Sequence, residues 1–263
     1  MIHDKWIATI ADRITSEVDT ISQSLTQRIT ELGDRYDRPM PVIQKLASEY
    51  ENEAQEYLIL LTGKKRLPWF EGEWKTQKLG DVANFYKWKW LPKSALIDNW
   101  TYKCIHYGEL FTKYHEVIEN IISYTNENEN VFLSKANDIL MPTSDVTPNW
   151  LATASCIKED DVILWWDVLI IRPNTNNLDW VFLSYNITND KSQIMQLVSW
   201  TTVFHIYASD MAKFEFQCPE IEEQRAIVSL IANLDKEIKA LEDKKNKYLH
   251  IKKAMMQQLL RGE

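Results

Sequence analysis

The chain is short of cysteine and has no long apolar run. Its three cysteines, Cys104, Cys156 and Cys218, are odd in number and widely spaced, which argues against a disulfide framework and a cysteine-rich metal site. The longest apolar run, residues 162–171, is shorter than a membrane-spanning helix and is interrupted by Asp167. The N-terminus carries charged and polar residues where a signal peptide would be apolar. We therefore expect a cytoplasmic protein without membrane contact.

The chain also lacks an excess of basic charge. Its net charge is −8, divided as −5 over residues 1–62, −4 over residues 63–218 and +1 over residues 219–263. This balance argues against indiscriminate nucleic-acid binding, which depends on a surplus of lysine and arginine. Residues 87–113 are a local exception, because five lysines there stand against two acidic residues. The composition therefore allows a local basic surface on an otherwise acidic protein.

Catalytic motifs are absent from the sequence. It has no glycine-rich phosphate loop, no HExxH, no CxxC and no nucleophile elbow. It also lacks the Asn/Asp-Pro-Pro-Tyr/Phe run that holds a target adenine in amino-methyltransferases. The five histidines are scattered, and the acidic run at 159–161 is more typical of a solvated loop than of a metal site. We predict a non-catalytic chain with no metal site and no cofactor of its own.

Both ends of the chain show the spacing of amphipathic helices. Apolar residues recur every three or four positions over residues 5–32 and 42–61, and a glycine follows each segment. Residues 219–263 open with a proline and an acidic first turn and continue as one long heptad pattern. Such a seam requires a second helix to pack against. Its apolar positions are Ile227, Ile231, Leu234, Ile238, Leu241, Tyr248, Met255 and Leu259, and Lys245 and Lys252 occupy the two remaining seam positions.

The middle of the chain has a different pattern, in which turns separate short apolar runs. Short helices are predicted near residues 115–123 and 181–196. Strands are predicted near residues 79–85, 102–106, 138–141, 152–157, 162–172, 202–207 and 214–217.

These patterns predict an α+β fold, in which a mixed α/β domain is flanked by long helices that form a coiled-coil spacer. We expect an N-terminal helical region of two helices at residues 1–62. The mixed domain is expected at residues 63–218 and the long C-terminal helix at residues 219–263.

Several segments, met in a fixed order, indicate a family. Residues 64–82 read KKRLPWFEGEWKTQKLGDV, residues 102–114 read YKCIHYGELFTKY, and residues 198–207 read VSWTTVFHIY. The PEIEEQ opening of the last helix follows them. In this order, over residues 60–263, the chain resembles the specificity (S) subunit of a type I restriction-modification system. Such subunits normally carry two target recognition domains, and this chain has room for one, so it resembles a half-length form.

The resemblance implies a specificity subunit that reads a half-site of duplex DNA and docks methyltransferase (modification) subunits. The restriction subunit would join through the complex, and this chain would not itself be an enzyme. S-adenosylmethionine, ATP and Mg²⁺ are implied for the partner subunits, with none bound by this chain. A chain with one recognition domain would pair with a second copy as a homodimer, and its target would then be palindromic and gapped. Residues 1–33 are the alternative partner for the long helix.

A second interpretation is an acidic coiled-coil interaction protein that regulates or inhibits such a complex without reading DNA. The net charge and the presence of only six glycines favour it. Tryptophan stands where the family has glycine, which reaches positive φ without steric cost. These rings are either natural and project from loops, or they stand at glycine positions that engineering or a sequence error has altered. The positions are Trp88, Trp90, Trp100, Trp150, Trp165, Trp166, Trp180 and Trp200.

The segments that carry the resemblance also supply candidate DNA contacts. Lysines can position phosphates, and hydroxyl, imidazole and aromatic side chains in turns can read bases. Simpler roles are solvated loop lysines, a core position for Tyr107 and a turn cap for Asp145. The candidates are the phosphate contacts Lys87, Lys89 and Lys93 and the base-reading residues His106, Tyr107, Thr112, Lys113, Tyr114, Thr143, Ser144, Asp145, Thr147, Thr201 and Thr202.

Overall fold

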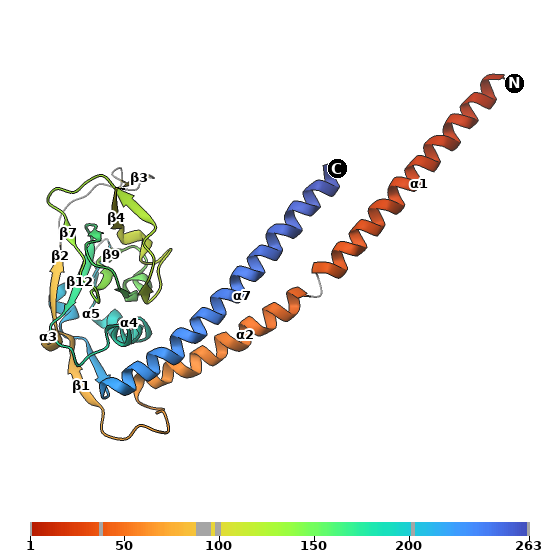
Figure 1. Cartoon of the computed structure of the whole chain (residues 1–263). Helices are drawn as coiled ribbons and strands as arrows, with labels where there is room; N and C mark the ends of the chain where they lie inside the picture. The colour runs from red at the N-terminus through yellow and green to blue at the C-terminus, as the bar shows by residue number, and fades with distance from the viewer. Residues whose placement is uncertain (1, 37–38, 88–95, 98–100, 201–202, 262–263) are drawn as a thin grey trace. The chain divides into compact units, whose positions relative to one another are not determined.

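The computed structural model describes the chain except residues 1, 37–38, 88–95, 98–100, 201–202 and 262–263 (Figure 1). The chain divides into two compact units. Residues 1–55 and 233–263 form the helical unit, and residues 56–232 form the strand-rich unit. Among the described residues, none of the helices combines the length and the hydropathy needed to cross a bilayer. The mixture of long helices and short strands confirms the predicted α+β class.

The helical unit contains α1 (Ile2–Tyr36), α2 (Pro39–Leu58) and most of α7 (Ile221–Arg261). α1 continues through Gly33, where the sequence had predicted its end. Within α1, the hydroxyls of Thr20, Thr26 and Thr30 each donate to the carbonyl four residues earlier, so these polar side chains bond within their own helix. α2 begins at Pro39, whose missing N–H costs nothing in the first turn of a helix.

Within the helical unit, α2 and α7 lie side by side (Figure 1). Ile43 and Ala47 of α2 are buried, and Tyr50 hydrogen-bonds to Glu237 of α7, which raises the pKa of the Tyr50 hydroxyl. On α7, Leu234 is buried. The seam residues Ile238, Leu241, Lys245, Tyr248 and Met255 are less exposed than their helical neighbours, and Leu259 lies in the last turns of the helix.

The first two residues of the predicted seam belong elsewhere. Ile227 and Ile231 are fully buried in the main core of the strand-rich unit rather than in the helical unit. The heptad spacing is therefore shared by two different packing surfaces. A periodic apolar stripe shows that a helix is covered, and it does not show which element covers it.

The described residues of the strand-rich unit form four small sheets. Their orders are β1-β15, β2-β12-β8-β10-β5, β3-β6-β4-β11-β7 and β13-β14-β9. The strands are β1 (Lys75–Lys78), β2 (Ala83–Lys87), β3 (Leu96–Ile97), β4 (Tyr102–Ile105), β5 (Val117–Ile118), β6 (Ser123–Thr125), β7 (Phe132–Leu133), β8 (Ile139–Pro142), β9 (Ser144–Asp145), β10 (Ser155–Ile157), β11 (Ile163–Leu164), β12 (Val168–Pro173), β13 (Ser199–Trp200), β14 (Phe204–His205) and β15 (Glu215–Cys218).

The sheet built around β12 is covered on both faces. Successive side chains of a strand point to opposite faces, so Leu169 and Ile171 enter one core while Val168 and Ile170 enter another. β8 and β10 alternate in the same way between the two cores. Burial on both faces explains why residues 162–171 form an apolar run without being a membrane segment.

Short helices complete the strand-rich unit. They are η1 (Ile59–Thr62), α3 (Leu79–Val82), η3 (Tyr107–Glu109), η4 (Pro148–Ala152), α4 (Trp180–Asn189), α5 (Lys191–Leu197) and α6 (Ala208–Met211). The predicted helix near 181–196 is confirmed as α4 and α5, which Asp179 and Asp190 cap at their N-termini. The predicted helix near 115–123 is wrong, because Val117 and Ile118 form β5 and pair in parallel with β10.

The start of α7 is fixed to the strand-rich unit by its Glu-Gln pair. Glu223 is 2% exposed and accepts hydrogen bonds from Arg66 Nη2 at 2.6 Å and Trp74 Nε1 at 3.2 Å. Gln224 Oε1 accepts from the Asp179 backbone N–H at 2.8 Å. A buried carboxylate is tolerable only when it is paired and hydrogen-bonded. We call Arg66, Trp74, Glu223 and Gln224 the α7 clamp.

Four of the tryptophans that stand where glycine was expected have side chains that the structure describes. Trp165 is fully buried and Trp180 is buried at the start of α4, whereas Trp150 and Trp166 are exposed. The non-glycine residues with positive φ in the described chain are Asn130, Asn137, Asp161 and Asp167, so none of these four tryptophans needs the glycine conformation. Trp200 ends β13, and Trp88, Trp90 and Trp100 lie outside the described residues.

Candidate nucleic-acid interface

One cluster of polar candidates gathers around Asp167, in the turn between β11 and β12. Asp167 has a left-handed backbone, with φ +67°. Its carboxylate accepts hydrogen bonds from the hydroxyls of Thr143 and Ser144 and lies 3.2 Å from Lys87 Nζ. Burial alone would raise the pKa of the Asp167 carboxyl. The two hydroxyls and the ammonium outweigh burial and hold that pKa below its ordinary value.

The candidates in this cluster differ in whether their side chains can contact a ligand, and Thr143 cannot. Thr143 is 1% exposed and its hydroxyl is used within the cluster, so its side chain faces the interior. The Lys87 amine is already used in part within the cluster, because it also donates a hydrogen bond to the Thr143 hydroxyl at 2.8 Å. Ser144 and Asp145 form β9, which pairs with β14. The Asp145 carboxylate accepts from the Thr147 N–H at 2.6 Å, as its alternative role of turn cap requires.

The loop around η3 is held in one conformation by a buried carboxylate. Glu109 accepts hydrogen bonds from the His106 N–H at 2.9 Å, from Lys113 Nζ at 2.8 Å and from the Ser123 hydroxyl. The His106 ring is largely buried, and its Nδ1 accepts from the Gly108 N–H at 3.1 Å. His106 is therefore part of the scaffold of this loop together with the buried Glu109 and Leu110, whereas Thr112 and Lys113 are exposed.

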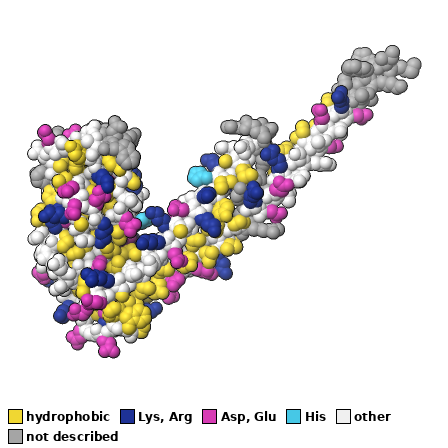
Figure 2. Space-filling view, in the orientation of Figure 1, with side chains coloured by type: hydrophobic (Ala, Val, Ile, Leu, Met, Phe, Trp, Pro, Cys, Tyr) yellow, Lys and Arg dark blue, Asp and Glu magenta, His cyan; other side chains and the backbone are white. Residues whose placement is uncertain are grey.

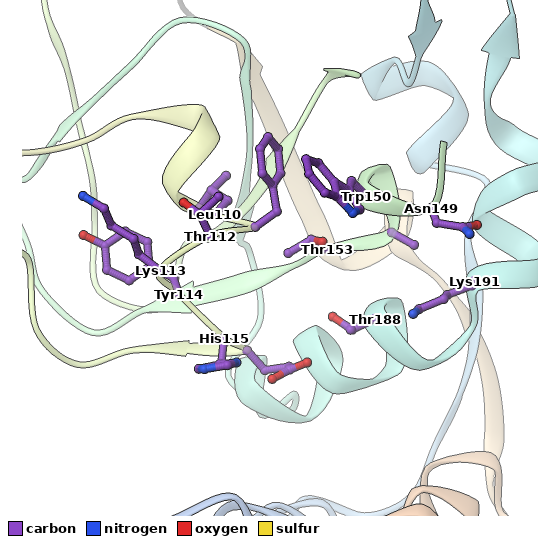
Figure 3. A pocket seen from close by; sticks show the side chains of 13 residues that line it. Leu110, Thr112, Lys113, Tyr114, His115, Asn149, Trp150, Thr153, Thr188 and Lys191 are labelled. Atoms are coloured by element: carbon purple, nitrogen blue, oxygen red, sulfur yellow. The ribbon is translucent and has the colours of Figure 1, made fainter. Parts of the chain in front are cut away.

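Side chains of this loop line a pocket of about 390 Å³ (Figure 3). Thr112, Lys113 and Tyr114 come from the η3 loop, and Asn149 and Trp150 come from η4. In Figure 3 the amine end of Lys191 points toward Thr188, across from the residues of η4. Three segments far apart in the sequence thus meet around one space that offers amines, hydroxyls, an amide and flat rings. The remaining lining residues are Leu110, Phe111, His115, Glu116, Ala152, Thr153, Thr188 and Lys191.

Burial controls the titration of Tyr114 at this pocket. Burial raises the pKa of its hydroxyl, and the neighbouring Glu109 charge raises it further. The hydroxyl therefore stays protonated across the physiological pH range and remains available as a hydrogen-bond donor. It also accepts the Ile122 N–H at 3.5 Å.

A family model described as "Type I restriction modification DNA specificity domain" matches residues 71–250, which is more than half of the chain. The chain belongs to this family. The match begins beside the α7 clamp, at Glu71, and contains every loop described above.

Solved structures share the fold of this specificity domain. The HsdS subunit from Thermoanaerobacter tengcongensis superposes with a TM-score of 0.57 at 15% identity, over 92% of this chain and 59% of that one. The S subunit of a type I restriction-modification system from M. genitalium gives 0.60 at 13% identity, over 91% and 59%. A chain from a study titled as the assembly and conformational transition of the type I R-M system gives 0.57 at 13% identity, over 90% and 58%. This chain therefore spans somewhat more than half of the length of these proteins.

The sequence predicted part of the lining of this pocket and missed another part. It named Thr112, Lys113 and Tyr114, but it did not name Phe111, Asn149 or Lys191, which line the same pocket. The run Thr-Pro-Asn-Trp at 147–150 was the available signal, since a tryptophan in a turn seldom belongs to the core. Lys89, Lys93, Thr201 and Thr202 lie outside the described residues.

Metal ligands do not converge in the described part of this specificity domain, where no group of three or more His, Cys, Asp or Glu side chains could hold an ion. The acidic run at 159–161 is used in loop contacts instead. Glu159 pairs with Lys103 at 2.5 Å, and Asp160 accepts the Ala136 N–H at 2.8 Å.

Proposed function

We propose that the strand-rich unit reads a half-site of duplex DNA as the specificity component of a type I restriction-modification complex. The observation that carries the proposal is the pocket where the η3 loop, η4 and the α4–α5 junction meet. Lys191 can position a phosphate, while a hydroxyl and an amide can bond base edges; the Lys113 amine is already paired with Glu109 at 2.8 Å. Family membership over residues 71–250 supports DNA as the ligand of this surface.

The modest charge of the unit supports selective rather than general binding. Figure 2 shows basic and acidic side chains interspersed over the visible face of the strand-rich unit. Non-specific affinity grows with the number of phosphates neutralised, so a mixed surface keeps it low. Selectivity must then come from a few well-placed contacts, and we propose Thr112, Asn149 and Lys191 for them.

The test is a titration of labelled duplex in the presence of a type I methyltransferase subunit. Sites selected from a random duplex pool are compared with the unselected pool at several salt concentrations. We expect selected sites to bind more tightly, and Lys191→Ala to lower the salt slope by about one. Lys78→Ala is the matched control, because Lys78 lies on β1 and is paired with Glu215 outside the pocket. Absence of DNA binding with and without the methyltransferase subunit would contradict the proposal.

The proposal extends to pairing between two copies through the helical unit. Ile14, Val18, Ile21 and Ile29 form a stripe on α1, and each is 57–60% exposed in the single chain. We call these four residues the α1 stripe. An apolar stripe at helical spacing is stable in water only when another surface covers it.

Charge supports a second copy as the partner of the α1 stripe. Residues 12–34 of α1 carry five acidic and two basic residues, whereas residues 244–261 of α7 carry six basic residues and no acidic ones. Opposite charges flanking two apolar seams favour their pairing and set its register. We propose that α1 of one copy lies along residues 244–261 of the other, so that the pair brings together two recognition domains.

Light scattering tests the pairing directly. We expect the purified chain to have the mass of a dimer and to dissociate more readily as salt rises. Addition of a methyltransferase subunit should give a larger complex, since the proposal includes docking of such subunits. A monomer both alone and with the methyltransferase subunit would overturn the pairing and leave α2 as the partner of α7 within the single chain.

A second candidate function follows from the net charge of −8. An acidic coiled-coil protein could bind the methyltransferase subunits without reading DNA and so regulate the complex. The same titration separates the two functions. Binding of the methyltransferase subunit together with absence of sequence-selective DNA affinity would support this second candidate.

A further inference from the structure

Four aromatic side chains form a chain of ring contacts along the surface of the strand-rich unit. We call Trp166, Tyr107, Phe111 and Trp150 the aromatic ladder. The centroid distances between successive rings are 6.5, 6.0 and 4.9 Å, and the last pair is stacked with an interplanar angle of 30°. The ladder ends at the pocket, because Phe111 and Trp150 are both lining residues (Figure 3).

The two ends of the ladder are exposed, whereas its middle rings, Tyr107 and Phe111, are partly buried, and Tyr107 packs against the second core, as its alternative role predicted. Trp150 and Trp166 are each 46% exposed, while Trp165, next in sequence to Trp166, is fully buried. Leaving two indole rings half in water forgoes the burial free energy that a tryptophan normally contributes. The two half-exposed indole rings are joined by the partly buried Tyr107 and Phe111, so they form one continuous line of aromatic contacts that leads to the pocket.

The side chains beside the ladder indicate the chemistry of a ligand that suits this pocket. Thr112, Asn149, Thr153 and Lys191 place hydroxyls, an amide and an amine around the space next to Trp150. A flat ring bordered by donors and acceptors suits a nucleobase, which has a π-face and a polar edge. An apolar protein anchor would instead need a pocket lined by aliphatic side chains.

We propose that the aromatic ladder and the pocket hold unstacked nucleobases. A base would stack on Trp150 or Phe111 and direct its edge to Thr112 and Asn149, with Lys191 near the adjoining phosphate. Bases inside an intact duplex do not present a free face, so the site engages a base that has left the helix. The inference rests on the proposed DNA recognition and adds that recognition includes a locally opened strand.

The experiment compares labelled single-stranded and duplex oligonucleotides of the same mixed sequence by fluorescence anisotropy, using the full chain. We expect Trp150→Ala and Phe111→Ala to weaken single-strand binding by about 5- to 150-fold each, the range for loss of one stacking contact. Duplex affinity should fall far less. Trp150→Phe keeps a ring and should recover most of the single-strand affinity, which a purely structural role would not require.

Trp69→Ala is the matched control. Trp69 is 69% exposed in the same unit and lies outside the ladder and the pocket, so its removal should leave single-strand binding unchanged. Thermal unfolding of each variant establishes that the unit remains folded. The inference is overturned if Trp150→Ala and Trp69→Ala bind single strands equally, or if the wild type prefers the duplex.

Two further outcomes have definite meanings. If the ladder variants keep single-strand affinity but lose binding to the methyltransferase subunit, the ladder is a protein interface and the inference is wrong. Failure of the proposed DNA recognition gives a different result, because the wild-type protein would then show no preference for selected duplex sites over the unselected pool. If the wild type binds selected duplexes while the ladder variants bind single strands as tightly as the wild type does, the proposed DNA recognition stands and the inference about the ladder is wrong.

Discussion

The strand-rich unit buries its apolar side chains, whereas the helical unit leaves a stripe of them exposed. β12 sends its apolar residues into cores on both faces of its sheet, and the first turns of α7 complete one of these cores. The α1 stripe, by contrast, contacts water along most of its length. One unit is completed by its own residues, and the other leaves an apolar stripe exposed, which we propose a second copy covers. Mutations should therefore act on folding in the first unit and on association in the second.

The largest effect is expected at the centre of the main core. Phe182 of α4 is fully buried and makes an edge contact with Trp74, at a centroid distance of 6.4 Å. Phe182→Ala should lower the free energy of unfolding of the strand-rich unit by about 3–5 kcal/mol, because it leaves a cavity. Urea unfolding followed by tryptophan fluorescence measures this. A loss below about 1 kcal/mol would show that the core is loosely packed and would weaken the contrast between the units.

The next effect concerns the α7 clamp. Arg66→Ala would leave the Glu223 carboxylate buried without its cation, and we expect a loss of about 3 kcal/mol in the free energy of unfolding. Lys78→Ala is the control, because the Lys78–Glu215 pair is half exposed and should contribute less than about 0.5 kcal/mol. Equal losses in the two variants would mean that the clamp does not fix α7 to the unit.

A smaller, pH-dependent effect is expected at Asp167. Asparagine tolerates the left-handed backbone, so Asp167→Asn removes the charge and leaves the turn intact, at a cost of about 1 kcal/mol. The carboxyl pKa is lowered in the folded protein. The difference between wild type and variant should thus be complete above its ordinary value of 3.8 and disappear as the pH falls through the lower folded pKa. Urea midpoints at neutral and acidic pH test this, and a difference that grows on acidification would contradict it.

A substitution on α1 is expected to have the smallest effect on folding and the largest effect on assembly. Ile21→Asp changes an exposed position and should alter the free energy of unfolding of the strand-rich unit by less than about 0.5 kcal/mol. It should nevertheless shift the light-scattering mass from dimer to monomer, because it places a charge in the proposed interface. Ser22→Asp, on the polar side of the same helix, is the control. A dimer that survives Ile21→Asp would exclude the α1 stripe as the contact surface.

The sequence predicted long-period features better than local chemistry. The heptad pattern placed the C-terminal helix correctly, and the order of four motifs identified the family before any geometry was known. The heptad pattern could not show that Ile227 and Ile231 pack in one unit while Ile238 lies in the other, because the periodicity of a helix does not identify its partner.

Local predictions failed where tertiary contacts decided the outcome. Residues 115–123 became extended because β10 supplies a parallel neighbour for Val117 and Ile118. Thr143 was predicted to contact bases from a polar turn. Its hydroxyl instead faces inward and donates a hydrogen bond to Asp167, whose backbone is left-handed. Phe111 and Trp150 are 39 positions apart in sequence, and only folding brings their rings into contact.

The α7 clamp also sets the order in which the protein can be completed during synthesis. Arg66 and Glu223 are separated by 157 positions, so the strand-rich unit stays open until the ribosome has released the first turns of α7. The helical unit waits longer still, since α2 meets residues beyond 232. The N-terminal helices are made first and find their partners last, so nascent chains on neighbouring ribosomes carry exposed helices while the domain behind them is unfinished.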